Sequence, residues 1–169
     1  MQTTTPLNVL FLCTHNSARS IMAEAVLNHL GGTLLTAYSA GSSPRAHQQP
    51  NPFALQALQA AGIASAGLHS KSWDVFARPD APRMDLVITV CDSAAAEACP
   101  YWPGQPASAH WGYPDPSHTQ GSDADKLAAF QQTLLALQQR IERLLSLAPA
   151  RMDRLALQQQ ARALAQEQP

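Results

Sequence analysis

The 169-residue sequence carries little charge and no long apolar run, and each shortage excludes a class of function. Eleven basic and 12 acidic residues leave a net charge of −1, which gives no electrostatic attraction for nucleic acid or an anionic membrane. No apolar run approaches the length that spans a bilayer. The segment from Met1 to Pro6 lacks the basic region and the apolar core of a signal peptide. We therefore expect a cytoplasmic protein that binds neither nucleic acid nor membrane.

Cysteine is also scarce, and the three cysteines are an odd number. This count argues against a framework of structural disulfides in a cytoplasmic chain and favours reactive thiols at Cys13, Cys91 and Cys99. The spacing of Cys91 and Cys99 fits neither a CxxC zinc motif nor a thioredoxin motif. Taken alone, these two could equally be unrelated residues, one buried at a strand end and one in a loop.

The alternation of strand and helix patterns predicts an α/β protein. Apolar, β-rich runs at 9–12, 33–40 and 85–90 are separated by helical patterns, which favours a parallel sheet covered on both faces. Asn51 and Pro52 are suited to begin one helix, with Ala54, Leu55, Leu58 and Ala61 on one face. The length suits one domain with a proper core.

The last third of the chain is predicted to be helical. Ser122 or Asp123 begins the longest helix, whose apolar stripe runs from Leu127 to Leu144. A last, short helix is predicted from Arg151 to Gln166. It is expected to dock through Met152, Leu155 and Leu164.

The segment from Leu7 to Leu30 reads as a buried strand, a turn and a helix, and its turn spells Cys-x5-Arg-Ser. Backbone N–H groups that enter a helix, together with the helix dipole, favour a bound oxyanion. Arg19 adds a planar fork of donors for two oxygens, and both the dipole and Arg19 are expected to lower the pKa of Cys13. A thiolate beside a bound oxyanion can attack it, so this arrangement predicts covalent catalysis. The alternative is a buried strand-end cysteine with a surface arginine. The predicted substrate-binding residues are Thr14, His15, Asn16, Ser17, Ala18, Arg19 and Ser20.

Asp115 is the candidate general acid, because a carboxylic acid near the oxyanion can protonate a leaving oxygen. Cys13, Cys91 and Asp115 each follow a predicted strand. Ligands of open parallel sheets bind beyond the carboxyl ends of the strands, so these three residues are expected at one edge. Without Cys13, a plain turn aspartate between two prolines would be the better interpretation of Asp115.

The stretch from Asn8 to Glu24 resembles the active-site signature of the low-molecular-weight tyrosine phosphatase superfamily, and more closely the arsenate reductases built on that fold. The phosphatase pattern is Cys-x-Gly-Asn-x-Cys-Arg-Ser, in which His15 here replaces the glycine and Ala18 the second cysteine. The stretch from Thr89 to Pro100 resembles the redox segment of the thioredoxin-coupled arsenate reductases, whereas the phosphatases lack this cysteine pair.

The resemblance covers about residues 7–147 and implies both a fold and a reaction. The fold is a four-stranded parallel sheet flanked by helices, flavodoxin-like, in a catalytic domain at 1–149 with a C-terminal helical extension at 150–169. The implied activity is arsenate reduction for arsenic detoxification. Cys13 attacks arsenate held by the loop and Arg19, and Asp115 protonates the departing oxygen. Cys91 then attacks Cys13, and Cys99 passes the disulfide outward.

The resemblance implies an external thiol reductant, either thioredoxin or glutaredoxin with glutathione, and no bound metal or organic cofactor. Potassium is an additional candidate ligand, since four positions match those that bind it in some of these reductases: Asn16, Glu24, Ser39 and Asp74.

Two other functions remain open at this stage. A low-molecular-weight protein tyrosine phosphatase would need Cys13, Arg19 and Asp115 but not the other two cysteines. Ser117 and His118 follow Asp115 where phosphatases usually place aromatic residues, which predicts poor specificity for aryl substrates. A non-catalytic oxyanion-binding or redox-sensing module would bind anions without turnover.

Overall fold

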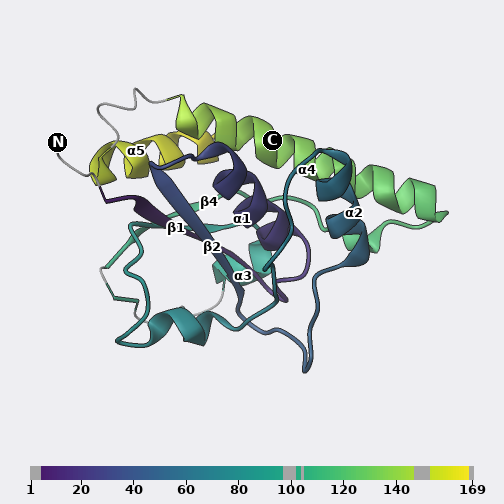
Figure 1. The fold of residues 1–169 in the computed structure, drawn as a ribbon, viewed down its shortest axis with the longest axis horizontal. Coiled ribbons are helices and arrows are strands. Elements are labelled where there is room, and N and C mark those ends of the chain that lie inside the picture. Colours follow the sequence, from purple (N-terminus) through teal and green to yellow (C-terminus); the bar gives the residue numbers. More distant parts are fainter. Residues whose placement is uncertain (1–4, 97–101, 104, 147–152, 168–169) are drawn as a thin grey trace.

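The computed structural model describes residues 5–96, 102–103, 105–146 and 153–167. Within them a parallel four-stranded sheet has the strand order β2-β1-β3-β4 and is flanked by helices, which confirms the predicted fold class (Figure 1). The strands are β1 (Leu7–Cys13), β2 (Leu35–Gly41), β3 (Leu86–Thr89) and β4 (Ala107–His110). The helices are α1 (Arg19–Leu30), α2 (Pro52–Ala60), α3 (Asp92–Ala96), α4 (Asp123–Leu145) and α5 (Arg154–Ala165), with short 3₁₀ helices η1 (Trp73–Ala77) and η2 (Pro116–His118).

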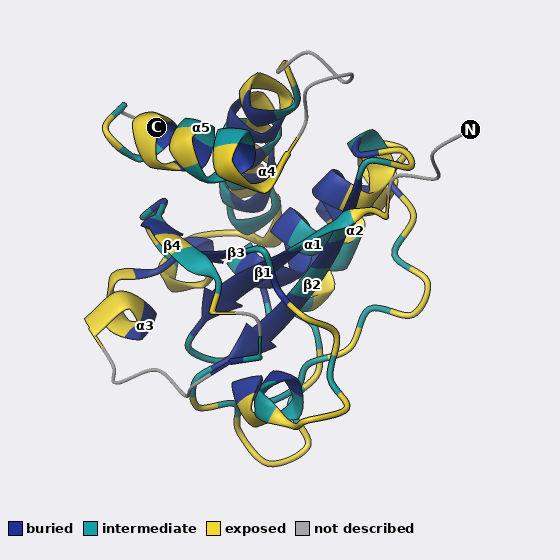
Figure 2. Ribbon diagram, turned by 90° about the vertical axis from the view of Figure 1, so that its left-hand side faces the viewer, coloured by how far each residue is buried: buried dark blue, intermediate teal, exposed yellow. Residues whose placement is uncertain are grey.

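Strand β1 is buried on both faces, as expected for an inner strand of a parallel sheet. Val9 and Phe11 join the core formed with α1, α2, α4 and α5. Leu10 and Leu12 point to the opposite face and pack with Trp73 of η1 and its neighbours. Figure 2 shows α1, α2, α4 and α5 on one side of the strands and the segment that contains η1 on the other. This layering fixes Cys13 at the carboxyl end of a rigid inner strand.

Side-chain caps explain why two predicted helices begin where they do. The Asn51 side chain accepts from the backbone N–H of Phe53 at 2.9 Å, and Pro52 occupies the first turn of α2. Ser122 and Asp125 form a reciprocal capping box at α4. In α2 the prediction for Ala61 is wrong: it is exposed, because Ala61 already lies beyond the last helical turn, while Ala57 is buried.

The last helix docks through Leu164, as predicted, but not through Leu155. Asp153 caps α5 by accepting from Ala156 N–H, so the helix begins at Arg154 rather than Arg151. Leu155 is 63% exposed, which corrects its predicted docking role, and Met152 lies outside the described residues. The buried face is formed by Leu157, Ala161 and Leu164.

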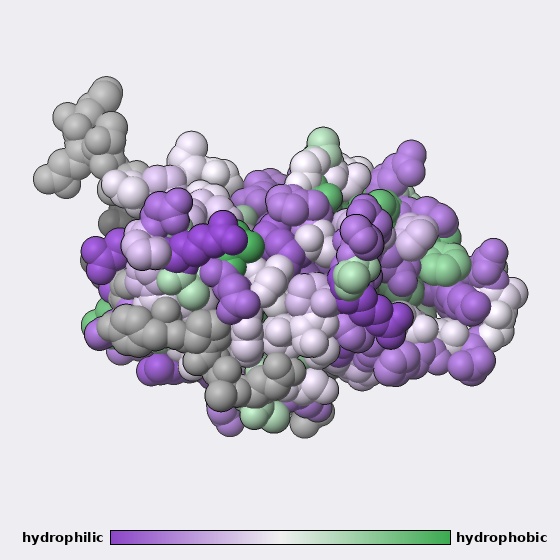
Figure 3. All heavy atoms as spheres, turned by 90° about the horizontal axis from the view of Figure 1, so that it is seen from below, coloured by the Kyte–Doolittle hydropathy of each residue, from purple (hydrophilic) through white to green (hydrophobic). Residues whose placement is uncertain are grey.

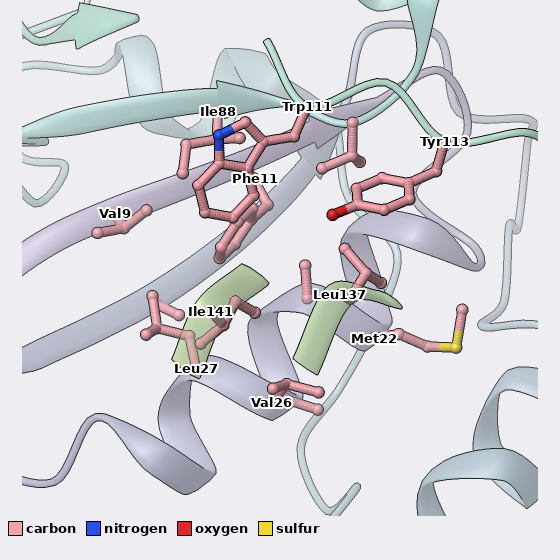
Figure 4. Packing of buried hydrophobic residues seen from close by; sticks show 14 of the residues in the cluster. Val9, Phe11, Met22, Val26, Leu27, Ile88, Trp111, Tyr113, Leu137 and Ile141 are labelled. Atoms are coloured by element: carbon pink, nitrogen blue, oxygen red, sulfur yellow. The ribbon is translucent and has the colours of Figure 1, made fainter. Parts of the chain in front are cut away.

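Helix α5 packs along the edge strand β4 and is tied to it by polar bonds. Arg162 Nε donates to the Ser108 carbonyl at 3.3 Å, and the buried Trp111 indole N–H donates to the Ala161 carbonyl at 3.0 Å. Figure 4 shows Trp111 and Tyr113 on the same side of the sheet as Leu137 and Ile141 of α4. The two helices therefore hold the segment that follows β4.

The surface is largely polar. In the face shown in Figure 3, strongly hydrophobic residues are few and scattered. Among the described residues, the large hydrophobic side chains that are exposed are Leu135 and Leu155. None of the helices in the described part of the chain has the length and apolar character needed to cross a membrane.

Candidate active site

The Cys13–Ser20 loop turns its carbonyl groups toward the surrounding scaffold. Five of these oxygens accept hydrogen bonds of 2.6–2.9 Å, and the donors are Ser42 N–H to Cys13, Ser43 N–H to Thr14, Ser70 Oγ–H to Asn16, Asn51 N–H to Ser17 and Met22 N–H to Ala18. Because these five carbonyl groups bind outward, the N–H groups of the loop are expected on the opposite, inner side. We infer that this inner side is the anion-binding concavity expected from the sequence.

Asn16 is the structural centre of the loop. It adopts the left-handed conformation (φ 57°) that asparagine tolerates better than most residues, and it is fully buried. Its side-chain amide donates to Ser20 Oγ at 2.8 Å and to Ser39 Oγ at 3.0 Å, and its Oδ1 accepts from Lys71 N–H at 3.0 Å. Asn16 therefore joins the loop to β2 and to the segment before η1.

Gly41 allows β2 to lie directly against the loop. A Cβ at this position would sit 2.6 Å from the Thr14 carbonyl oxygen and 2.9 Å from the His15 carbonyl carbon, both backbone atoms. The contact explains why the strand ends in glycine. Gly41, Ser70 and Lys71 were missed by sequence reasoning, since none belongs to a recognisable motif and all are distant from Cys13 along the chain.

The Cys13 thiol is buried at the base of this loop. Its sulfur lies 2.8 Å from Ser20 Oγ and accepts from Asn16 N–H at 3.3 Å. Burial nevertheless raises the pKa of Cys13 above its ordinary value, and the hydrogen bonds from Ser20 and Asn16 only partly oppose this effect. The predicted lowering of the Cys13 pKa is thus wrong, because desolvation of the sulfur outweighs the favourable donors.

Arg19, at the start of α1, points toward the segment that follows β4. Its Nη1 donates to the Tyr113 carbonyl at 2.8 Å, and its Nη2 lies 3.4 Å from Asp115 Oδ2. Its Nε is buried without a hydrogen-bond partner in the described structure. A buried donor of this kind costs free energy unless it is satisfied, and an oxyanion oxygen would satisfy it. The arrangement orients the guanidinium fork for anion binding.

Asp115 lies beside Arg19 and also caps η2, so it is both a turn aspartate and a member of the site. Its Oδ1 accepts from the Ser117 backbone N–H at 2.9 Å and from the Ser117 hydroxyl at 2.7 Å. Burial alone would raise the pKa of Asp115, but the Ser117 bonds and the charges of Arg19 and His118 outweigh burial and lower the pKa. The carboxyl group of Asp115 is therefore ionised at neutral pH.

Cys91 reaches the same loop from the neighbouring strand. Strands β1 and β3 pair directly, and Cys91 follows β3 and precedes α3. The buried sulfur of Cys91 lies 3.5 Å from Oγ1 of Thr14, the residue that follows Cys13 in the chain. Both cysteines are free thiols. Cys99 lies outside the described residues. Cys91, Cys13, Arg19 and Asp115 thus meet at the carboxyl edge of the sheet, as the strand positions predicted.

Glu24 and Ser39, two of the four positions matched to a potassium site, lie beside an ammonium group, and the Asn16 amide donates to the Ser39 hydroxyl. Lys71 Nζ donates to the Ser39 carbonyl at 2.9 Å and lies 4.0 Å from Glu24 Oε1. Asp74 is exposed and accepts instead from Ser72. A potassium ion at this cluster would be repelled by the buried ammonium, so the residues present do not fit a bound cation.

The sequence and the fold have known counterparts. Residues 8–161 match the low molecular weight phosphotyrosine protein phosphatase family. An arsenate reductase from Bacillus licheniformis is 38% identical over 136 residues, which cover 80% of this chain and 92% of that protein. A solved arsenate reductase in its reduced state is 28% identical, with a TM-score of 0.62 over 82% of this chain and 95% of its own. A thioredoxin-dependent arsenate reductase from Corynebacterium glutamicum shares the fold at 23% identity, with a TM-score of 0.54 over 83% of this chain and 64% of its own.

Proposed function

The chain belongs to the low molecular weight phosphotyrosine protein phosphatase family, and we propose that within this family it is an arsenate reductase that works through a relay of cysteines. The observation that carries this proposal is the position of Cys91. Its thiol lies 3.5 Å from Thr14 Oγ1, beside a loop that already holds one buried thiol. A phosphatase needs a single nucleophile, whereas reduction of arsenate needs two thiols for the two electrons it consumes.

The first step forms a bond between sulfur and arsenic. Hydrogen arsenate binds to the loop N–H groups and Arg19, and the Cys13 sulfur displaces one oxygen, which leaves as water. The proton that this water needs comes from the Cys13 thiol, which its raised pKa keeps protonated. Because the pKa of Asp115 is lowered, its carboxylate is available to carry that proton. Asp115 takes up this proton and delivers it to the departing oxygen as general acid.

The second step transfers two electrons to arsenic. The Cys91 sulfur attacks the Cys13 sulfur, the sulfur–arsenic bond breaks, and its electron pair stays on arsenic. Arsenic(V) becomes arsenic(III) and leaves as arsenite, while two thiols become a Cys13–Cys91 disulfide. A phosphoryl group on Cys13 has no comparable reduction and can only be hydrolysed, which leaves residual phosphatase activity as a side reaction.

The third step returns the enzyme to its reduced form through an external thiol. Cys99 attacks Cys91 and presents a Cys91–Cys99 disulfide to thioredoxin or to glutaredoxin with glutathione. Helix α3 (Asp92–Ala96) lies between the two cysteines in the chain. A relay of free thiols persists only in a reducing compartment, which supports a cytoplasmic location.

One assay tests the proposal as a whole. Purified protein is supplied with arsenate and NADPH, coupled in one arm to thioredoxin and its reductase and in the other to glutaredoxin, glutathione and glutathione reductase. We expect NADPH oxidation that depends on arsenate and matches the arsenite formed. Release of phosphate from aryl phosphate without thiol consumption would instead indicate a phosphatase. Anion binding without either activity would indicate a binding module.

Asp115→Asn is expected to slow the first turnover about 10²–10⁴-fold, the usual contribution of a general acid. Asparagine keeps an oxygen that can accept from Ser117, so η2 should remain capped and phosphate should bind at least as tightly. Rapid-quench measurement of arsenate consumption in a single turnover checks the rate, with Ser117→Ala as the control that retains the carboxyl group. A rate for Asp115→Asn equal to that of Ser117→Ala would remove Asp115 from the chemistry.

The two later cysteines should give distinct phenotypes. Cys91→Ser is expected to stall with arsenic on Cys13. Cys99→Ser is expected to complete one reduction, release arsenite and stop as a Cys13–Cys91 disulfide. Mass spectrometry of digests after one equivalent of arsenate distinguishes these products. Normal turnover of Cys99→Ser with glutaredoxin and glutathione would show that glutathione, rather than Cys99, resolves the disulfide.

Lys71 is expected to make the enzyme independent of potassium. Its ammonium already supplies positive charge beside Glu24 and Ser39. Arsenate turnover at constant ionic strength should be the same in potassium and tetramethylammonium chloride. Lys71→Met removes the ammonium and should become slower and potassium-stimulated, whereas Lys126→Met in the first turn of α4 should behave as wild type. Potassium stimulation of the wild-type enzyme would contradict this assignment.

A further inference from the structure

We propose that Arg140, a buried arginine of α4, is a positioning residue that acts through Tyr113 on the anion-binding Arg19. Arg140 is only 6% exposed, although it lies within the apolar stripe of α4 between Leu137 and Ile141. Among the described residues no carboxylate lies within salt-bridge distance of it. A buried charge without a counter-ion is costly, so its other contacts require an explanation.

Two aromatic rings and one carbonyl hold the Arg140 guanidinium. Its central carbon lies 5.5 Å from the ring centre of Trp111 and 5.3 Å from that of Tyr113. Its Nη2 donates to the Glu167 backbone carbonyl at 2.8 Å, just after α5. A guanidinium over two electron-rich faces is stabilised by both, and its planar donors fix the position of the group. Arg140 therefore joins Trp111, Tyr113 and the end of α5.

Tyr113 carries this contact into the active site. Its ring touches Arg140, while its carbonyl oxygen accepts from Arg19 Nη1 at 2.8 Å. Its backbone N–H donates to the Val90 carbonyl at 3.2 Å, which ties the same residue to the end of β3 beside Cys91. A shift of the Tyr113 ring would therefore move the carbonyl that sets the direction of the Arg19 fork.

Helix α5 supports the segment that follows β4 as well. Trp111 is fully buried, and its indole N–H is held by the Ala161 carbonyl. Trp111 and Tyr113, whose rings contact Arg140, both lie in the segment between β4 and Asp115. Contacts with α4 and α5 therefore hold this segment in place just before Asp115. By this route the C-terminal helix contributes to the geometry of the oxyanion site without touching the substrate.

The test compares Arg140→Met with Arg143→Met, a control on the same helix whose side chain is more exposed and pairs with the Glu167 carboxylate. Phosphate binding is measured by calorimetry on the reduced protein, and arsenate KM and kcat are measured in parallel. Arg140→Met is expected to weaken phosphate binding about tenfold and to raise arsenate KM by a similar factor, since loss of the two ring contacts releases Tyr113. Arg143→Met should match wild type in both.

A purely structural role would lower the melting temperature of Arg140→Met and leave phosphate affinity and KM unchanged, which would overturn the proposal. If Arg140→Met does not fold, Arg140→Lys decides: it keeps the charge but cannot hold both rings and the carbonyl, so it should bind phosphate about threefold more weakly. Wild-type affinity in Arg140→Lys would then refute the role. The measurement of arsenate KM and kcat rests on the proposed reductase function, but the measurement of phosphate binding does not. A wild-type protein that binds phosphate without reducing arsenate would therefore refute only the reductase function.

Discussion

Replacing Cys13 with serine is expected to abolish arsenate reduction, with turnover falling to the level of the reaction without enzyme. In the proposed relay the Cys13 sulfur forms the bond to arsenic and later becomes half of the disulfide, and a serine hydroxyl can do neither. Burial already raises the pKa of the thiol, and an alcohol at the same place would ionise far less readily. The measurement is arsenite formation under the two coupled reductant systems.

The serine variant should nevertheless bind phosphate, since the loop is held by bonds to its carbonyl groups. The sulfur receives one loop N–H, from Asn16, and a serine oxygen can accept from the same donor. Calorimetry with phosphate therefore separates lost chemistry from a collapsed loop. Arsenite formation by Cys13→Ser above background would show that the nucleophile lies elsewhere.

Arg19→Lys is expected to raise arsenate KM and the phosphate inhibition constant about 100-fold. This is the usual cost of losing one charged hydrogen bond from a two-pronged contact. In the structure one arm of Arg19 binds the Tyr113 carbonyl, another faces Asp115, and the buried Nε has no partner among the described residues. An ammonium group provides a point charge and cannot satisfy these directions together.

Steady-state kinetics with phosphate as competitor measures this loss, and Arg45→Lys is the matched control because Arg45 is exposed in the loop after β2. The control should match wild type. If phosphate inhibits Arg19→Lys as strongly as it inhibits the wild type, the two-pronged contact of Arg19 with the anion is wrong. The pair of variants separates the shape of the cation from its charge.

Local signals in the sequence predicted the parts of the site that depend on one short segment. The buried strand before Cys13, the helix after Arg19 and the caps at Asn51 and Ser122 were all readable, because each depends on neighbours along the chain. The four-stranded parallel sheet and the meeting of Cys13, Cys91 and Asp115 at its carboxyl edge followed from the strand positions and the family resemblance.

Features that depend on packing between distant segments were not predicted. The pKa of Cys13 follows from desolvation by several elements at once, and no local pattern reports it. Leu155 was expected to dock α5, but the cap at Asp153 and contact with β4 select Leu157 instead. Arg140 sits where an apolar stripe predicts a hydrophobic side chain, and its burial is explained by the rings of Trp111 and Tyr113 and by the Glu167 carbonyl.

The strand order also has a consequence for newly made chains. Strand β1 is synthesised first but lies inside the sheet, and Tyr113, Asp115 and α5 are added about a hundred residues or more later. At ordinary translation speeds Cys13 then waits on the order of ten seconds before Tyr113 and Asp115 are added. During this interval the thiol lacks the burial that raises its pKa in the finished protein. We therefore expect nascent chains, rather than the folded enzyme, to be the form in which oxidants most readily inactivate Cys13.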